Sequence, residues 1–327
     1  MILFDSVTRQ FHRKDGSVIT AVDGLTLHIP KGMTIGVIGA SGAGKTTFLK
    51  LVCGLLAPDN GRVKVKKRVP SKERRTLSES VSVLFADTSG LHPEKTVQDN
   101  LDLVRASYAN KERRKATASD EEQDRYEYLM EELNLMPYRD EMVSNLSLGF
   151  RRRAELVAAF LKPAELFLLD EPCIGLDEQA KEGFEKIVRT CQKEGTTILL
   201  SSHSMGEVDA LSRRVLLLNE GKAVFYGDRE SLYRNMAKIN RMAVTFVDRI
   251  PDMQDLPFGG YELDNRSMRI RYNADHVTAA ELLRTILETS VIHEVSMEKP
   301  SLEDIIAETA TQKGRINEPH NRSRTGK

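Results

Sequence analysis

The stretch that decides the fold is Gly39-Ala40-Ser41-Gly42-Ala43-Gly44-Lys45-Thr46-Thr47, which fits the phosphate-binding pattern G-x-x-x-x-G-K-[ST] at every fixed position. Its glycines allow backbone N–H groups to turn inward around an anion, and a helix that begins near Lys45 points its positive end at the same place. In this pattern the lysine reaches the β- and γ-phosphates of a nucleotide, and the Thr46 hydroxyl ligates Mg²⁺. Residues 39–47 therefore predict a nucleotide-binding loop.

Both flanks of this loop have the character that the pattern requires. The apolar, β-branched run Thr34–Ile38 before it is typical of a parallel strand buried on both faces. After it, apolar residues recur at helical spacing up to the turn at 58–61, and these are Phe48, Leu51, Val52, Leu55 and Leu56. A strand, a glycine-rich loop and a helix in this order favour a P-loop fold.

Length and composition limit the remaining possibilities. A chain of 327 residues is long enough for two or three domains of the usual ~100–200 residues. Lys+Arg and Asp+Glu both total 48, so the formal net charge is zero. The chain therefore lacks the overall positive charge that would indicate nucleic-acid binding. Three cysteines without C-x-x-C or metal-ligand spacing are interpreted as structural thiols in a reducing compartment. Since no apolar run approaches the ~18–20 residues of a membrane span and no signal peptide is recognisable, we expect a cytosolic polypeptide.

The first thirty residues alternate apolar and polar side chains on either side of Asp15-Gly16, a dipeptide typical of hairpin turns. We therefore expect an N-terminal antiparallel β subdomain. A basic run follows between residues 61 and 75, where Glu73 is the one acidic residue. Such a run is typical of a solvated loop, and a membrane-facing or partner-facing patch is the alternative.

Short buried strands recur farther along the chain, at 81–85, 166–169, 196–200 and 215–218. The turn signal Glu220-Gly221 joins the last of these to 223–225 as a hairpin. Residues 97–161 differ from the rest, because they are rich in Glu, Arg, Lys, Ala and Leu at helical spacing. The pattern predicts an α/β fold with a mainly parallel sheet and an inserted helical subdomain at about 90–162.

Beyond about residue 231 the pattern changes again. Short strands are expected at 243–247, 268–272 and 292–297, around a helix at 279–289. We interpret 231–312 as a small α+β C-terminal domain. The polar segment 313–327 has almost nothing to bury and is expected to be disordered.

A second nucleotide-site signal is the apolar run 166–169 followed by Asp170 and Glu171. Ligands of open α/β sheets bind at the carboxyl ends of the strands, so Asp170 is placed to hold the Mg²⁺ shell. Adjacent residues of a strand point in opposite directions, so Glu171 can aim its carboxylate at an attacking water instead. This is the pattern of a Walker B strand.

Between these motifs lies Leu146-Ser147-Leu148-Gly149-Phe150, and here the chain resembles the ATP-binding subunits of ABC transporters, whose signature is usually written LSGGQ. The motifs occur in the family's order: residues 39–47, 146–150, 166–171, the D-loop Gly175-Leu176-Asp177 and the switch histidine His203. The resemblance covers about residues 1–230. It is greatest to the branch that pairs with ABC-2-type membrane subunits, whose frequent "EPSLEDIF" ending is similar to residues 299–305.

The resemblance implies roles for several residues. Ser147 and Gly149, at a helix N-terminus, would contact the γ-phosphate held by another subunit. His203 would bond the same phosphate and link it to Glu171, and Asp177 would lie at the dimer interface. Phe11 occupies the place of the aromatic residue that stacks on adenine, with a place in the core of the N-terminal sheet as the alternative.

Two positions depart from the family pattern. Asp87 stands where a glutamine normally touches Mg²⁺ and contacts the membrane subunit; an aspartate can ligate Mg²⁺ but cannot donate an amide hydrogen bond. Phe150 replaces the signature glutamine, whereas Ser147 and Gly149 are retained.

The resulting prediction is an ATPase subunit that requires ATP and Mg²⁺, closes head to tail as a homodimer or with a paralogue, and drives an ABC-2-type membrane subunit, with export favoured. It would lie on the cytoplasmic face of the membrane. The alternatives are a catalytically weak subunit that gates a complex, motivated by Asp87 and Phe150, and a soluble ABC ATPase acting on ribosomes or DNA. A P-loop kinase is disfavoured because kinases lack the signature and the D-loop.

Overall fold

The computed structural model describes residues 1–108, 120–235, 239–247, 250, 260–274 and 276–298. The chain divides into two compact units, Met1–Tyr226 and Gly227–Lys327. This division lies close to residue 230, where the composition of the sequence changes, and the assignment of functional domains stays a prediction. The segments 313–327 and 299–305, which we singled out in the sequence, lie outside the described residues.

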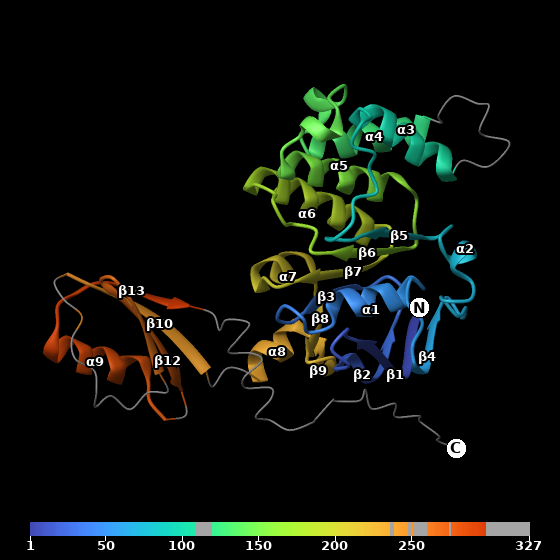
Figure 1. Cartoon of the computed structure of the whole chain (residues 1–327). Coiled ribbons are helices and arrows are strands. Elements are labelled where there is room, and N and C mark those ends of the chain that lie inside the picture. Colours follow the sequence, from blue (N-terminus) through green and yellow to red (C-terminus); the bar gives the residue numbers. More distant parts are fainter. Residues whose placement is uncertain (109–119, 236–238, 248–249, 251–259, 275, 299–327) are drawn as a thin grey trace, which may run out of the picture. The chain divides into compact units, whose positions relative to one another are not determined.

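The first unit is built on a six-stranded sheet (Figure 1) in the order β5-β6-β7-β3-β8-β9. Its strands are β3 (Thr34–Ile38), β5 (Val81–Leu84), β6 (Leu166–Asp170), β7 (Thr197–Ser202), β8 (Arg214–Asn219) and β9 (Lys222–Asp228). The β5–β6, β6–β7, β7–β3 and β3–β8 pairs are parallel. Every residue of β3, β6 and β7 is buried, which explains their continuous apolar runs.

The predicted hairpin between β8 and β9 is present. Its two turn residues, Glu220 and Gly221, have φ values of 47° and 78°. Two consecutive residues with positive φ form the turn whose twist suits a tight hairpin.

A separate antiparallel sheet in the order β2-β1-β4 covers one side of the parallel sheet, as the alternating N-terminal sequence predicts. Its strands are β1 (Ile2–His12), β2 (Val18–Ile29) and β4 (Asn60–Val65). Helix α1 (Lys45–Val52) lies between the two sheets in Figure 1. One apolar core joins them, with Phe4 of β1, Phe48 of α1 and Leu168 of β6 among its buried members.

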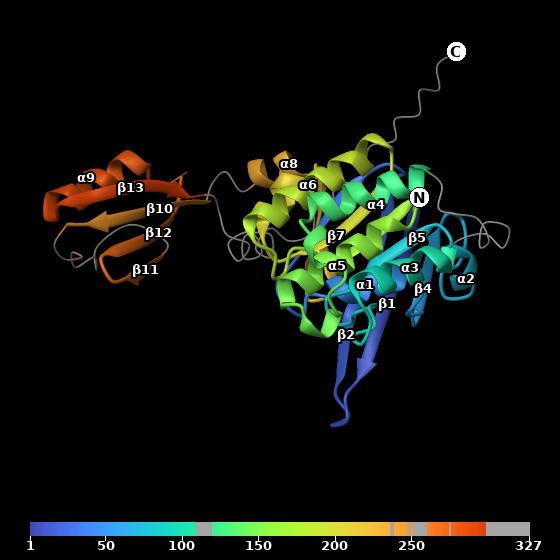
Figure 2. The same cartoon turned by 90° about the horizontal axis from the view of Figure 1, so that it is seen from above.

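Helices occupy the other side of the parallel sheet (Figures 1 and 2). They are α3 (Val97–Tyr108), α4 (Asp120–Glu132), α5 (Leu148–Leu161), α6 (Glu178–Lys193) and α7 (Met205–Leu211), with 3-10 turns at Met136–Tyr138 and Val143–Asn145. Helices α3 and α4 pack on α5, as expected for an inserted helical region. The described part of the chain contains no helix that is long and apolar enough to span a bilayer.

Two local predictions were wrong. Helix α1 ends at Val52 rather than near Leu56, because Gly54 adopts a φ of 75° and stands so close to Pro70 that a Cβ would lie 2.2 Å from its carbonyl oxygen. The basic run was expected to be a loop, but it contains most of β4 and the first two residues of the short helix α2 (Arg74–Leu77). Pairing of β4 with β1 supplies the tertiary contacts that the composition of this run does not indicate.

The second unit contains α8 (Arg229–Asn235) and a four-stranded antiparallel sheet in the order β11-β12-β10-β13. Its strands are β10 (Ile239–Phe246), β11 (Gly260–Asp264), β12 (Ser267–Asn273) and β13 (Ile292–Glu298), and α9 (Ala279–Thr289) packs on the sheet. Thr278 and Glu281 form a reciprocal capping box that fixes the start of α9. The α+β character of this region is therefore present, and β11 is the strand that the sequence pattern missed.

Candidate functional site

The nine-residue loop connects the end of β3 to the start of α1, as its pattern requires. Gly44 precedes the helix with a φ of 101°, and a Cβ there would lie 2.1 Å from the carbonyl oxygen of Ala21. Only glycine fits that position. Lys45 Nζ donates to the carbonyl oxygens of Gly39 at 2.8 Å and Ala40 at 3.3 Å, so its ammonium group lies over the loop.

The carboxylate of Asp170 lies directly beside the loop, at the carboxyl end of β6. The Thr46 hydroxyl donates to its Oδ2 at 2.7 Å, and the Ser201 hydroxyl donates to its Oδ1 at 2.5 Å. Asp170 is almost fully buried. Thr46 and Asp170, two of the three oxygen ligands predicted for Mg²⁺, are thus in contact although 124 positions separate them in sequence.

Glu171 follows immediately in a strained backbone conformation, with a φ of 47°. Its amide N–H donates to Ser201 Oγ at 2.9 Å. Its Oε1 lies 3.4 Å from Lys45 Nζ, and its Oε2 lies 2.8 Å from His203 Nδ1. The backbone turn therefore aims this carboxylate away from Asp170 and places it between the loop lysine and the histidine that follows β7.

Arg152 is a site residue that the sequence analysis did not single out. Its buried guanidinium donates from Nη2 to the carbonyl oxygens of Asp170 and Glu171, both at 2.8 Å, and from Nε to that of Pro172 at 3.3 Å. The same group therefore fixes the backbone that carries both predicted catalytic-site carboxylates. The signal for this role was a pair of arginines, Arg152 and Arg153, on a helix whose other buried residues are apolar, because a buried charge requires partners.

The signature residues form a second group. Ser147 caps α5, accepting a bond from the Phe150 amide at 3.3 Å. Gly149 lies against the D-loop, since a Cβ at Gly149 would be 2.6 Å from the carbonyl oxygen of Gly175. The intervening Leu148 side chain is strongly exposed, at 67%. The segment thus presents a helix N-terminus with an apolar residue at the surface.

Asp177 belongs to this second group. It caps α6 by accepting the Ala180 amide at 2.9 Å, and its other carboxylate oxygen accepts from Arg153. The Arg153 guanidinium also lies 4.5 Å from the centre of the Phe150 ring, which packs on Tyr138 at 4.0 Å. Phe150 is therefore held as part of a local cluster.

Asp87 and Phe11 each contact a basic side chain. Lys50, one turn beyond Thr46 on α1, donates to Asp87 Oδ2 at 2.8 Å and keeps the pKa of this carboxyl below its ordinary value. Phe11 is half-buried on β1, and the Arg9 guanidinium lies 4.9 Å above its ring. The structure thus brings together Lys45, Thr46, Asp170, Glu171 and His203. The binding and catalytic roles assigned to these and the other predicted residues stay predictions.

The fit of Mg²⁺ can be judged from the donors present. Within the described ranges, no cluster of three or more His, Cys, Asp or Glu side chains could hold a metal ion. Thr46 and Asp170 supply one hydroxyl and one carboxylate. Protein Mg²⁺ sites of this kind take their other ligands from substrate phosphates and water.

Comparison with known proteins identifies the family of this chain. The ABC transporter family model matches residues 22–174, a range that contains the loop, the signature and the Walker B strand. The ABC transporter ATP-binding protein NatA of Bacillus subtilis is 32% identical over 236 residues, covering 72% of this chain and 92% of that protein. The Nod factor export ATP-binding protein I of Paraburkholderia xenovorans is 32% identical over 231 residues. The matched region covers 71% of this chain and 72% of that protein.

Among solved structures, a dimeric post-hydrolysis state of an ATP-binding cassette bound to ADP and Pi has a TM-score of 0.62 with 20% identity. The matched region covers 70% of this chain and 98% of the chain in that structure. At that identity the likeness demonstrates the shared fold.

Proposed function

This chain belongs to the family of ABC transporter ATP-binding proteins, as an ATPase of that family, and we propose that it closes head to tail on two Mg·ATP to drive an ABC-2-type membrane subunit. The second half of each site would come from another copy of the chain or from a paralogue. The sequence has one P-loop and one signature, so a single chain cannot complete a shared site of this kind.

The observation that carries the proposal is the position of Glu171. Its carboxylate lies between Lys45 and His203, while Asp170, one residue earlier, contacts Thr46. One carboxylate is therefore available to a metal and the other to an attacking water. A carboxylate within one hydrogen bond of water can act as a general base, and His203 beside it would hold Glu171 in position when the γ-phosphate is present.

Bound Mg²⁺ would neutralise charge on the β- and γ-phosphates, and Thr46 and Asp170 would hold it. Lys45 would leave the carbonyl oxygens of Gly39 and Ala40 for the phosphate oxygens, because a phosphate is the stronger acceptor for an ammonium group. Asp87 would join the metal site only after its bond to Lys50 opens.

Dimerisation is supported by the exposed signature segment. Ser147 and Gly149 lie at the N-terminus of the fourteen-residue helix α5. The backbone N–H groups there could bind the γ-phosphate of a nucleotide held by the opposite subunit. Leu148, which lies between Ser147 and Gly149, and Ile174, which directly precedes the D-loop, expose 67% and 43% of their surfaces. A partner subunit that covers this segment would remove both apolar side chains from water.

Export is the transport direction we propose, because the similar Nod factor protein is named for export. The membrane subunit would place this protein at the cytoplasmic face of the cell membrane. A catalytically weak gating subunit is the second candidate, and the Asp87–Lys50 ion pair favours it by holding Asp87 away from a metal.

The test is phosphate release by the purified protein with ATP, with and without Mg²⁺, alone and after copurification with a candidate six-helix membrane protein from a neighbouring reading frame. We expect Mg²⁺-dependent hydrolysis and copurification. Binding of ATP without turnover, even beside the membrane protein, would favour the gating subunit. Absence of both binding and turnover would overturn the proposal.

A further inference from the structure

The segment 61–80 is strongly basic and runs from β4 to β5, the edge strands of their two sheets. Strand β4 and helix α2 lie along one edge of the first unit in both views (Figures 1 and 2). The segment contains eight Lys and Arg and two Glu, an excess of six positive charges in a chain whose formal net charge is zero. The charge of this protein is therefore distributed unevenly, with a cationic region at this edge.

The fold anchors this segment through its apolar residues. Val63, Val65, Pro70 and Leu77 are buried. The backbone is fixed as well, because the N–H groups of Val65 and Arg68 each donate to the carbonyl oxygen of the other at 2.9 Å. These two bonds close a tight turn in β4's continuation, and the side chains at its tip are basic.

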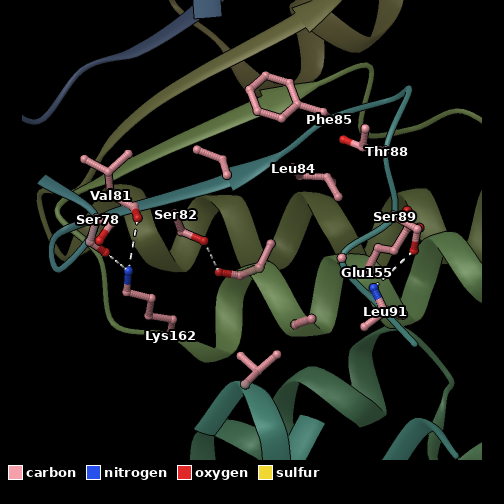
Figure 3. Close-up of a pocket in the computed structure, with 15 residues that line it drawn as sticks. Ser78, Val81, Ser82, Leu84, Phe85, Thr88, Ser89, Leu91, Glu155 and Lys162 are labelled. Carbon is pink, nitrogen blue, oxygen red and sulfur yellow. Dashed lines mark hydrogen bonds between the residues drawn. The ribbon is translucent and has the colours of Figure 1, made fainter. Parts of the chain in front are cut away.

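The two ends of the segment are bonded to the body of the first unit. Near its start, the amide of Lys66 donates to the carbonyl oxygen of Met1 at 2.9 Å. Near its end, Lys162 of α5 donates to the carbonyl oxygens of Ser78 and Val81 (Figure 3). The basic side chains are thus displayed from a backbone that the rest of the fold holds in place.

Most of these cations lack an acidic partner. Arg68 lies 2.7 Å from Glu73, and Lys66 pairs with Glu165. The other six are exposed, and in the part of the chain that the structure describes none of them forms an ion pair. We call these six the basic surface: Arg62, Lys64, Lys67, Lys72, Arg74 and Arg75.

An apolar side chain accompanies the basic surface. Leu3 of β1 lies directly opposite Lys64 of β4. Its neighbours Ile2 and Phe4 are fully buried, so the alternation of the strand turns Leu3 to the outer face together with Lys64. Leu3 is 41% exposed. This face therefore offers cations and an apolar group side by side.

We propose that the basic surface docks on the anionic phospholipid headgroups of a membrane, with Leu3 entering the boundary between headgroups and acyl chains. The inference rests on the proposed function, which brings this chain to the cytoplasmic face of a membrane. That face has a negative surface potential, which attracts clusters of about four to eight Lys and Arg. A cationic cluster and an apolar group together bind a lipid surface better than either alone.

A lipid surface fits the arrangement of the charges better than other polyanions do. Residues 61–80 contain no aromatic side chain, whereas proteins that bind single-stranded nucleic acids stack the bases on aromatic residues. The basic surface extends over a strand, a turn and a helix, with Arg62 on β4 and Arg75 on α2. Separate mobile headgroups can neutralise cations that are spread in this way, whereas one acidic peptide would have to follow all three elements.

The first experiment is flotation of the purified full chain with vesicles, in the absence of any membrane subunit. Vesicles of phosphatidylcholine are compared with vesicles that also contain phosphatidylglycerol. We expect a partition coefficient at least about tenfold higher on the anionic vesicles. The gain should disappear between about 0.1 M and about 1 M NaCl, because the screening length falls from about 10 Å to about 3 Å. Equal binding to both vesicles, or binding to neither, would overturn the inference.

A charge-matched pair of variants tests whether the position of the cations matters. One variant neutralises the basic surface at four positions and leaves Arg62, which has Asp5 opposite it in the β1–β4 register. The other neutralises four exposed cations elsewhere and so has the same net charge. The surface variant carries Lys64→Gln, Lys67→Gln, Lys72→Gln and Arg75→Gln, and the control carries Lys14→Gln, Lys95→Gln, Lys193→Gln and Arg213→Gln.

We expect the surface variant to lose at least about tenfold in partition coefficient on anionic vesicles, and the control less than about threefold. Both should bind ATP as the wild type does, because none of the eight side chains belongs to the nucleotide site. Exchange of the same surface positions for the other basic residue (Lys64→Arg, Lys67→Arg, Lys72→Arg and Arg75→Lys) should restore vesicle binding. Equal losses in the surface variant and the control, or no loss in the surface variant, would overturn the inference.

Leu3→Gln tests the apolar contact separately. It should lower binding to anionic vesicles about threefold, whereas Leu263→Gln, at a 57% exposed position of the second unit, should not. A surface variant that binds vesicles normally but no longer copurifies with the membrane subunit would overturn the lipid contact in favour of a protein partner. Loss of ATP hydrolysis and of copurification in the wild type would instead contradict the proposed function, since vesicle binding requires neither.

Discussion

Lys50 Nζ donates a 2.8 Å hydrogen bond to Asp87, and this ion pair connects the helix of the nucleotide loop to the loop that follows β5. The pair balances the charge of an aspartate at the position where the family resemblance implies a neutral glutamine. Lys50 neutralises the added charge, and its Nζ lies 5.3 Å from the centre of the Phe85 ring at the same loop. The departure from the family pattern is thus accompanied by a partner on α1.

Replacing Asp87 with glutamine tests whether this pair restrains the loop. We expect Asp87→Gln to raise the ATPase rate, because the neutral amide releases Lys50 and can donate a hydrogen bond. The unfolding free energy should change by less than about 1 kcal/mol, since the pair is partly exposed. Glu73→Gln, which removes the exposed Arg68–Glu73 pair elsewhere, is the control. Unchanged rates would mean that Asp87 is a tolerated substitute.

The same pair predicts a pH dependence of stability. Lys50 lowers the pKa of Asp87 from its ordinary 3.8, so the folded state keeps the carboxylate charged where the unfolded chain begins to protonate it. The stabilising contribution is therefore complete above the unfolded-state pKa and is lost as pH falls through the folded-state pKa. The difference in Tm between wild type and Asp87→Asn should be constant near neutral pH and shrink below about pH 4. In Lys50→Met this decline should be lost, because the pKa of Asp87 then returns toward its unfolded-state value, and an unchanged decline would exclude Lys50 as its cause.

Glu171→Gln should lower kcat by at least ~10²-fold, because the amide cannot accept a proton from water. ATP binding should persist, and an ATP-bound dimer should accumulate on gel filtration. Glu165→Gln is the matched control, since Glu165 precedes the opposite end of β6 and pairs with Lys31 and Lys66. Normal turnover in Glu171→Gln would remove this residue from the proposed mechanism.

Gly149→Ala tests the contact between the signature and the D-loop. The added Cβ would meet the Gly175 carbonyl oxygen at 2.6 Å, so we expect a loss of roughly 1–3 kcal/mol in unfolding free energy. ATP-dependent dimerisation should fail while the single chain still binds ATP. Gly90→Ala serves as the control because its Cβ meets open space. A dimer that forms normally in Gly149→Ala would contradict the assigned interface.

The three cysteines should be inert in the folded protein. Burial raises the pKa of Cys173 to about 12 and that of Cys191 to about 11, so thiolate is scarce at pH 8. We expect almost no reaction with a thiol reagent at pH 8 until the protein is unfolded in denaturant. Rapid labelling of the native protein at this pH would contradict this prediction and show that the thiols are accessible.

Much of the fold could be predicted because its determinants are local. Strand β3 has the limits expected from the apolar run Thr34–Ile38, and α9 begins and ends where the periodicity of 279–289 places it. The extent of α1 was wrong, because Leu55 and Leu56 continue the apolar spacing whereas the approach of Pro70 to Gly54 ends the helix. Strand β4 was hidden by its charged side chains, and pairing with β1 decides its conformation.

The sequence by itself determined the nucleotide loop, because phosphate binding depends on glycine dihedrals, a lysine and a hydroxyl within nine consecutive residues. It also determined the order of the motifs along the chain. Only the tertiary structure decided that Asp87 meets Lys50 and that Arg152 holds the backbone of Asp170 and Glu171. These partners lie 18 to 37 positions apart in sequence. Packing of α1 and α5 against the sheet that contains β5 and β6 brings them together. A charged or buried polar group takes whichever partner the folded chain places within reach, and no local pattern encodes that choice.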